Sequence, residues 1–134
     1  MLQAATLYLV TAAVFLGLDV LGIRLLIRPV FERHVGDLLA DPLRLGPAAL
    51  FYLVYIAGLL WMVSWPALKA GDPVQALIGG MVLGFLCYGT YEMTNYATLA
   101  AWSWQQVIVD GIWGTLLTGF AAWAGVAFVT GRMA

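Results

Sequence analysis

Three carboxylic acids lie within otherwise apolar stretches of the sequence: Asp19, Glu92 and Asp110. Ionisable side chains in such surroundings are costly to retain and are candidates for a functional role. In a functional interpretation, one of these carboxyl groups binds a cationic or hydroxylated ligand, or exchanges a proton. In a structural interpretation, Arg24 and Arg28 pair with carboxylates in the same layer and hold helices together. The sequence leaves both interpretations open.

Other polar side chains share helix faces with these carboxylates. Tyr88, Glu92 and Asn95 stand at positions i, i+4 and i+7, which lie on one face of a helix. We therefore predict one polar site, in which carboxyl groups hold a ligand's head group and an arginine balances charge or meets an anionic phosphate. The predicted site residues are Asp19, Glu92, Asp110, Asn95, Tyr88, Tyr55, Arg24, Arg28 and Trp113.

Several other kinds of chemistry find no support. His34 is the only histidine, and no H-x-x-x-H or E-x-x-H spacing accompanies the carboxylates, so no metal is expected. No G-x-S-x-G, P-loop or dinucleotide-binding motif is present, and no cofactor is expected. Cys87 is the single cysteine, which excludes a disulfide scaffold, and we predict that it is a small core residue.

The composition indicates an integral membrane protein. Of the 134 residues, 63% are hydrophobic and 10% are charged, and the mean hydropathy is +0.94. A soluble domain carries about 25% charged residues. The formal net charge of −1 offers no basic patch for nucleic acid. We expect one membrane domain over residues 1–134.

Four apolar stretches are long enough to cross a hydrocarbon core, which takes about 20 helical residues. They are apolar all round, which favours helices over a β-barrel. The sequence therefore predicts an all-α membrane protein, a four-transmembrane-helix bundle. The predicted spans are residues 4–23, 48–68, 74–99 and 106–129.

The connections between the spans are short, except for the first. Gly71, Asp72 and Pro73 predict a compact turn. In the long first loop, over residues 28–47, apolar side chains recur at helical spacing among charged ones. This pattern predicts a short amphipathic helix in the membrane interface, and an ordinary structured loop is the alternative.

The basic residues favour one orientation. Four arginines lie in or beside the first loop, whereas the opposite face has Lys69 and Arg132. The first and third loops are then cytoplasmic and both termini lie outside. At about 1.5 Å per residue, all three carboxylates fall within about 6–11 Å of the first-loop face, which predicts a pocket near the cytoplasmic leaflet. Trp102 and Trp104 are expected to form an aromatic belt there.

Pairs of small residues permit close contact between helices. Gly80 and Gly84 form such a pair in the third stretch, and Gly114 and Thr118 form another in the fourth. These pairs are compatible with a homodimer or with packing against a larger membrane complex.

The stretch YEMTNYATL at residues 91–99 resembles the domain-of-unknown-function 2177 family of small bacterial multi-pass membrane proteins. The blocks FLGLD at 15–19, RPVFERHVG at 28–36 and DGIWGT at 110–115 are also similar to that family's pattern. The pattern has a tryptophan shortly after the first-span aspartate, where this chain has Gly22. The resemblance implies a four-span protein of a bacterial inner membrane, in a family for which no activity is established.

Three hypotheses about function follow from the polar site. The first is a protein that binds or carries a lipid-like or small amphiphilic ligand, with the head group in the polar layer. The second is a membrane enzyme that modifies a lipid or isoprenoid, with Glu92 and Asp110 as an acid–base pair. The third is an accessory subunit of a larger membrane complex.

Overall fold

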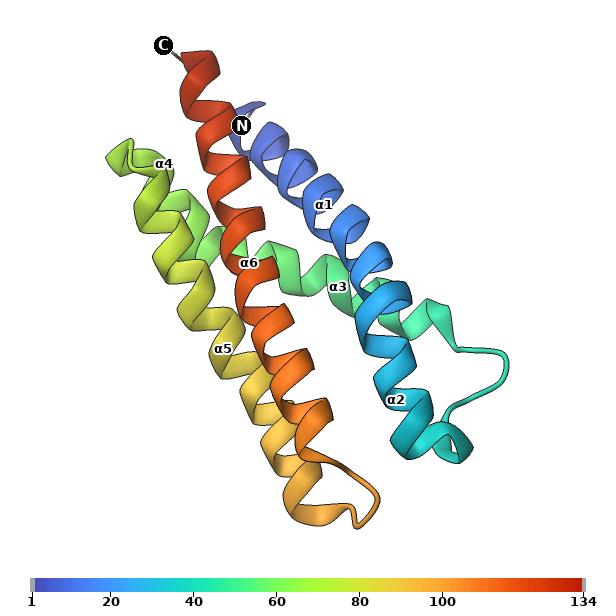
Figure 1. The fold of residues 1–134 in the computed structure, drawn as a ribbon. Coiled ribbons are helices and arrows are strands. Elements are labelled where there is room, and N and C mark those ends of the chain that lie inside the picture. Colours follow the sequence, from blue (N-terminus) through green and yellow to red (C-terminus); the bar gives the residue numbers. More distant parts are fainter. Residues whose placement is uncertain (1, 134) are drawn as a thin grey trace.

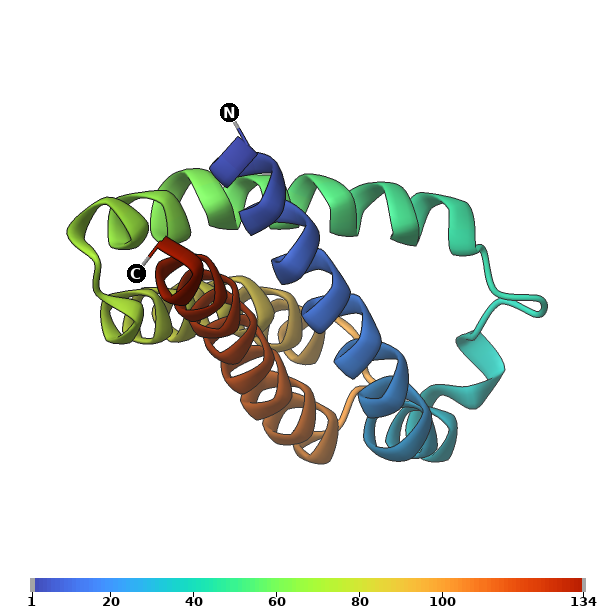
Figure 2. The same cartoon turned by 90° about the horizontal axis from the view of Figure 1, so that it is seen from above.

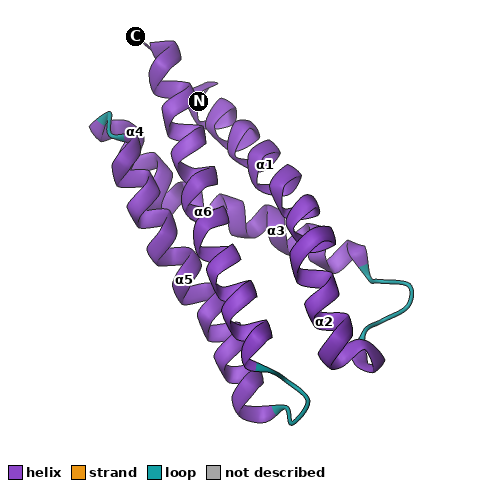
Figure 3. Cartoon of the chain, in the orientation of Figure 1, coloured by secondary structure: helices purple, strands orange, loops and turns teal. Residues whose placement is uncertain are grey.

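A computed structural model describes residues 2–133 of the chain, and within them the regular structure is entirely helical (Figures 1 and 3). Four helical lengths are long and apolar enough to cross a membrane: Leu2–Leu38, Leu45–Ala70, Pro73–Thr98 and Trp104–Arg132. The predicted all-α, four-span fold is confirmed. The spans differ from the predicted ones mainly at the first, which has 37 residues and is nearly twice as long as the predicted residues 4–23.

The first helix continues into the region predicted as the first loop, as far as Leu38. It comprises α1 (Leu2–Gly22), the π-helical turn η1 (Ile23–Ile27), α2 (Arg28–Val35) and the 3₁₀ turn η2 (Gly36–Leu38). The amphipathic segment is therefore helical, but it is an extension of the first span and no separate helix of the loop. The loop itself is short and lies between η2 and the second span (Figure 3).

A proline follows each of the two π-helical turns. Pro29 comes two residues after η1, and Pro66 comes two residues after η3 (Leu60–Ser64). Proline has no N–H and its ring clashes with the carbonyl group four residues before it. A wider turn before the proline moves that carbonyl group aside, so the helix continues where an α-helix would break.

The second span consists of α3 (Leu45–Leu59), η3 and α4 (Trp65–Ala70). It ends at Gly71, whose φ of +65° is left-handed and suits glycine. The Asp72 carboxylate then caps α5 (Pro73–Thr98) by accepting hydrogen bonds from the backbone N–H groups of Val74 and Gln75, at 3.1 and 3.2 Å. This is the compact turn that the sequence predicts.

The helices α5 and α6 (Trp104–Met133) lie antiparallel and in contact along their length (Figure 1). Glycines allow this approach: a Cβ added at Gly84 would lie 2.6 Å from the Gly114 carbonyl oxygen, and one at Gly80 would lie 2.9 Å from Gly119 Cα. The small pair at Gly80 and Gly84 is thus used within the chain and is not left free for a second copy.

The helix α1 packs on α6, and the apolar core forms around these contacts. One cluster contains Leu7, Leu59 and Val126, and a second contains Phe15, Ile56 and Leu117. These clusters take in only the C-terminal half of α3. Its N-terminal half crosses away from α5 and α6 (Figures 1 and 2), and Phe51 there is 66% exposed. The space between this half and α5 holds the candidate site.

Candidate functional site

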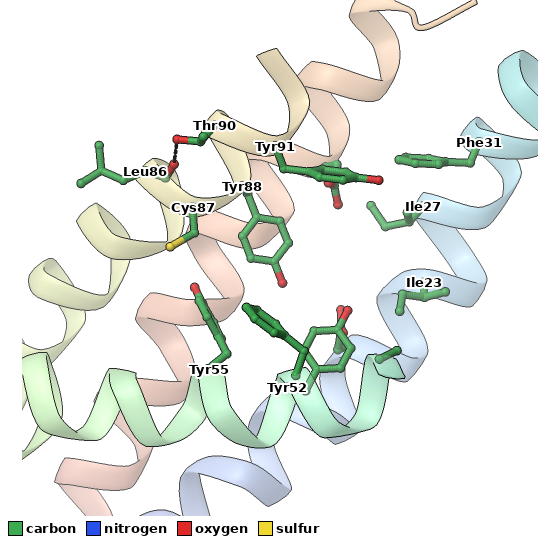
Figure 4. A pocket seen from close by; sticks show the side chains of 14 residues that line it. Ile23, Ile27, Phe31, Tyr52, Tyr55, Leu86, Cys87, Tyr88, Thr90 and Tyr91 are labelled. Carbon is green, nitrogen blue, oxygen red and sulfur yellow. Dashed lines mark hydrogen bonds between the residues drawn. The ribbon is translucent and has the colours of Figure 1, made fainter. Parts of the chain in front are cut away.

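A cavity of about 830 Å³ lies between the first helix, α3, α5 and α6. Figure 4 shows tyrosine side chains of α3 and α5 pointing into it, opposite Ile23, Ile27 and Phe31 of the first helix. The lining residues are Asp19, Ile23, Ile27, Phe31, Ala48, Phe51, Tyr52, Tyr55, Leu86, Cys87, Tyr88, Thr90, Tyr91 and Asp110. The cavity is therefore mostly apolar and aromatic, with two carboxyl groups.

Asp19 is buried in α1, with 4% of its surface exposed, and is held by groups from two other helices. Its Oδ1 accepts a hydrogen bond from Trp113 Nε1 on α6 at 3.2 Å. Tyr52 on α3 lies close to the same carboxyl group. The hydrogen bond from Trp113 offsets part of the free energy that burial of a carboxyl group costs.

Gly22 makes this arrangement sterically feasible. A Cβ at Gly22 would overlap the ring of Trp113, which lies against the backbone of α1 at that point. An indole group from α6 thus fills the space beside Gly22 and Asp19.

Asp110 lines the cavity, and Glu92 lies directly behind it. The register that sets Gly84 against Thr118 and Tyr88 against Gly114 also sets Glu92 against Asp110. The two carboxyl groups are thus close enough to interact electrostatically.

Glu92 is completely buried and does not line the cavity. Its Oε1 accepts a hydrogen bond from Trp102 Nε1 at 2.9 Å. Its Oε2 is buried and has no donor among residues 2–133. The structure thus brings the three predicted carboxyl groups together. Asp19 and Asp110 face the cavity, whereas Glu92 lies on the far side of Asp110.

The tyrosines form a rigid aromatic wall. Tyr55 shares a hydrogen bond of 3.0 Å with Thr118 Oγ1, and its ring meets that of Tyr88 edge to face, with centroids 6.4 Å apart. Phe15 packs against both Tyr52 and Tyr55, at centroid distances of 5.7 and 5.6 Å. Aromatic pairs at these distances stabilise each other and limit rotation of the rings.

An aromatic cluster closes the end of the cavity near α2. Trp102, in the loop between α5 and α6, meets Phe31 and Tyr91 edge to face, with centroids 5.2 and 6.0 Å away. In the same region, Arg33 Nη1 and His34 Nε2 both donate to Gln105 Oε1, at 3.1 and 2.9 Å. These contacts fasten α2 to the start of α6.

The two predicted arginines and Asn95 lie outside the cavity. Arg24 is exposed and lines no part of it. Arg28 pairs with Glu32 at 2.7 Å on the outer face of α2, and borders a neighbouring cavity of about 680 Å³. Within residues 2–133, neither arginine forms an ion pair with the three carboxylates, because α2 extends the first helix and presents these side chains outward. Asn95 is half-buried, beside Tyr91.

Several lining residues were absent from the predicted set. Tyr52 and Tyr91 stand three residues from Tyr55 and Tyr88, so the helical repeat carried a signal for them. Cys87 was predicted in the core, but it is exposed and lines the cavity. The prediction for Trp102 was a place in an aromatic belt, and its hydrogen bond to Glu92 was not foreseen.

A family model described as "Predicted membrane protein (DUF2177)" matches residues 4–127, nearly the whole chain. The chain belongs to this family. No curated protein and no solved structure matches it. The membership agrees with the four apolar helices, and it covers every residue that lines the cavity.

Proposed function

We propose that this protein binds or carries a lipid-like or small amphiphilic molecule in the cavity between α3 and α5. The observation that carries the proposal is the cavity's composition: Asp19 and Asp110 are joined to a long apolar and aromatic lining within membrane-spanning helices. A volume of about 830 Å³ is in the range of ligand sites, which measure about 300–1,000 Å³. The head group would meet the carboxyl groups, and the tail would lie against the apolar lining.

The route into such a site is from the side, through the lipid. Phe51 of α3 and Leu86 and Thr90 of α5 are exposed and also line the cavity. In a membrane, these side chains face acyl chains, so an amphiphile reaches the cavity between α3 and α5 without leaving the bilayer.

The proposal includes an orientation in the bacterial inner membrane. The excess of arginines beside the first loop favours a cytoplasmic position for that loop. The carboxyl groups then lie nearer the cytoplasmic leaflet, and both termini lie outside.

Native mass spectrometry of the gently solubilised protein tests the binding function. We expect a discrete extra mass that is lost in Asp110→Asn, because the amide cannot replace the carboxylate as an acceptor on both atoms. The control is Asp37→Asn, an exposed carboxylate in η2 outside the cavity, which should keep the mass. A bare wild-type chain would contradict the proposal, and a co-purified second protein would favour the accessory-subunit or homodimer hypothesis.

The Glu92–Asp110 pair supports a second candidate function, a membrane enzyme acting on a lipid or isoprenoid. Asp110 lines the cavity, and the register of α5 and α6 sets Glu92 against it. In this role, Asp110 exchanges a proton with the substrate and Glu92 exchanges one with Asp110. An enzyme of this kind loses turnover in Glu92→Gln while it keeps its fold, whereas a carrier keeps its ligand.

A further inference from the structure

We infer that the head group taken by this cavity donates hydrogen bonds, as an amine or a hydroxyl group does, and that a phosphate head group is excluded. The inference rests on the proposed function, and it names the class of ligand for that site. It departs from the expectation that an arginine would meet an anionic phosphate.

The polar groups that line the cavity are carboxyl, hydroxyl and thiol groups. The carboxyl groups belong to Asp19 and Asp110, and the remaining polar lining comes from tyrosine, Thr90 and Cys87. Among the described residues that line it, none is lysine, arginine or histidine. A site for phosphate is built from cationic side chains or from free backbone N–H groups at a helix N-terminus. Here the lining residues come from within helices, whose N–H groups are already paired.

The basic residues of the chain are engaged or exposed elsewhere. Arg28 pairs with Glu32, and Arg33 donates to Gln105. Lys69 lies over the Trp65 ring and Arg132 over the Phe128 ring, toward the opposite end of the helices. Arg24 and Arg44 are exposed. A phosphate in the cavity would therefore have no cationic partner, in surroundings where an unpaired charge is costly.

The carboxyl groups are also short of hydrogen-bond donors. Trp113 donates a hydrogen bond to one oxygen of Asp19, and Trp102 donates one to one oxygen of Glu92. Glu92 Oε2, completely buried, has no donor among residues 2–133, and Asp110 faces the cavity. An incoming ammonium or hydroxyl group supplies Asp110 with a donor and adds no further acceptor charge. Complementarity of charge and hydrogen bonding thus favours a donor head group.

The single cysteine provides the test, because Cys87 lines the cavity. The protein is placed in phosphatidylcholine vesicles, and the rate of Cys87 alkylation by N-ethylmaleimide is followed by mass spectrometry. Dodecylamine, dodecanol and dodecyl phosphate are added at equal mole fractions. We expect the amine and the alcohol to slow alkylation by about tenfold at saturation, since occupied protein is shielded. Dodecyl phosphate should leave the rate unchanged.

Two controls separate occupancy from effects on the bilayer. In Cys87→Ser with Phe120→Cys, the reporter lies on a lipid-exposed face of α6, and none of the amphiphiles should protect it. Protection by the amine should be lost in Asp19→Asn with Asp110→Asn, and kept in Asp37→Asn.

The outcomes distinguish this inference from the proposed function. Equal or stronger protection by dodecyl phosphate overturns the inference and leaves an amphiphile site in place. Phosphate protection that disappears in Arg28→Gln would place that head group in the neighbouring cavity that Arg28 borders. If no amphiphile slows alkylation, the proposed function fails as well. If dodecylamine still protects Cys87 in Asp19→Asn with Asp110→Asn, the alkyl tail alone accounts for binding. That result also overturns the inference.

Discussion

Trp102 contributes one of the hydrogen bonds that make the burial of Glu92 feasible. Its indole N–H donates to Glu92 Oε1, and its ring lies between Phe31 and Tyr91. A buried carboxyl group without donors costs several kcal/mol. The residue therefore joins the loop between α5 and α6 to the carboxyl pair and to α2.

The Trp102→Phe variant should be less stable by about 1–3 kcal/mol, because the ring stays but Glu92 loses its donor. Thermal unfolding in a fixed detergent measures the loss. Trp61→Phe is the control, since Trp61 is 78% exposed and should tolerate the change. In a Glu92→Met background, Trp102→Phe should have little further effect. Equal losses in both backgrounds would show that the hydrogen bond contributes nothing.

The position of each carboxyl group along its span predicted that the three groups lie close together. It did not predict the direction in which each side chain points. The distances of Asp19, Glu92 and Asp110 from the span ends placed them in one layer, and the structure brings them together. The shared helix face of Tyr88, Glu92 and Asn95 was a weaker guide. Glu92 faces α6, whereas Asn95 lies outside the cavity, because the packing partner of each face depends on tertiary structure.

At the scale of helices, the contact between α5 and α6 depends on glycines that meet backbone. Gly84 lies against the Gly114 carbonyl oxygen, with Thr118 Cβ 2.8 Å from the position of an added Cβ. Backbone atoms cannot move aside as the end of a flexible side chain can. The register that these glycines set is also the one that places Glu92 opposite Asp110.

Gly84→Ala should therefore destabilise the protein by about 1–3 kcal/mol through overpacking. Gly89→Ala on the same helix is the matched control, because an added Cβ there meets nothing within 4 Å. It should be neutral or stabilising by up to about 1 kcal/mol. Thermal unfolding of the two variants side by side checks this, and a neutral Gly84→Ala would show that the helices are less closely packed than described.

The helices themselves were largely predictable from hydropathy, and their ends and tilts were not. The second, third and fourth spans agree with the prediction to within a few residues. The first was cut short at residue 23, since the charged residues that follow were assigned to the first loop. The outward course of α3, which opens the cavity, could not be predicted. A helix that is apolar on all sides carries no pattern that indicates its direction.

For the whole molecule, four spans place both termini at the same end, as Figure 1 shows. With the first loop in the cytoplasm, alkaline phosphatase joined to the C-terminus should be active in a bacterial host, because that enzyme matures only in an oxidising compartment. The same reporter inserted after Asp41 should be inactive. The reverse pattern of activities would invert the proposed orientation and put the cavity nearer the outer leaflet.

Because of the π-helical turn at Ile23–Ile27, the number of residues in this segment decides which side chains of α2 face the cavity. Such a turn contains one residue more than an α-helical turn, so it offsets the faces of α1 and α2 by about 100°. Loss of one residue there would restore a regular helix and leave the hydropathy profile almost unchanged. Phe31 would nevertheless turn out of the cavity, and Arg33 would turn away from Gln105. An alignment of homologous sequences by hydropathy alone would hide this rotation of α2. A one-residue gap within 23–27 therefore marks a chain in which other side chains line the cavity.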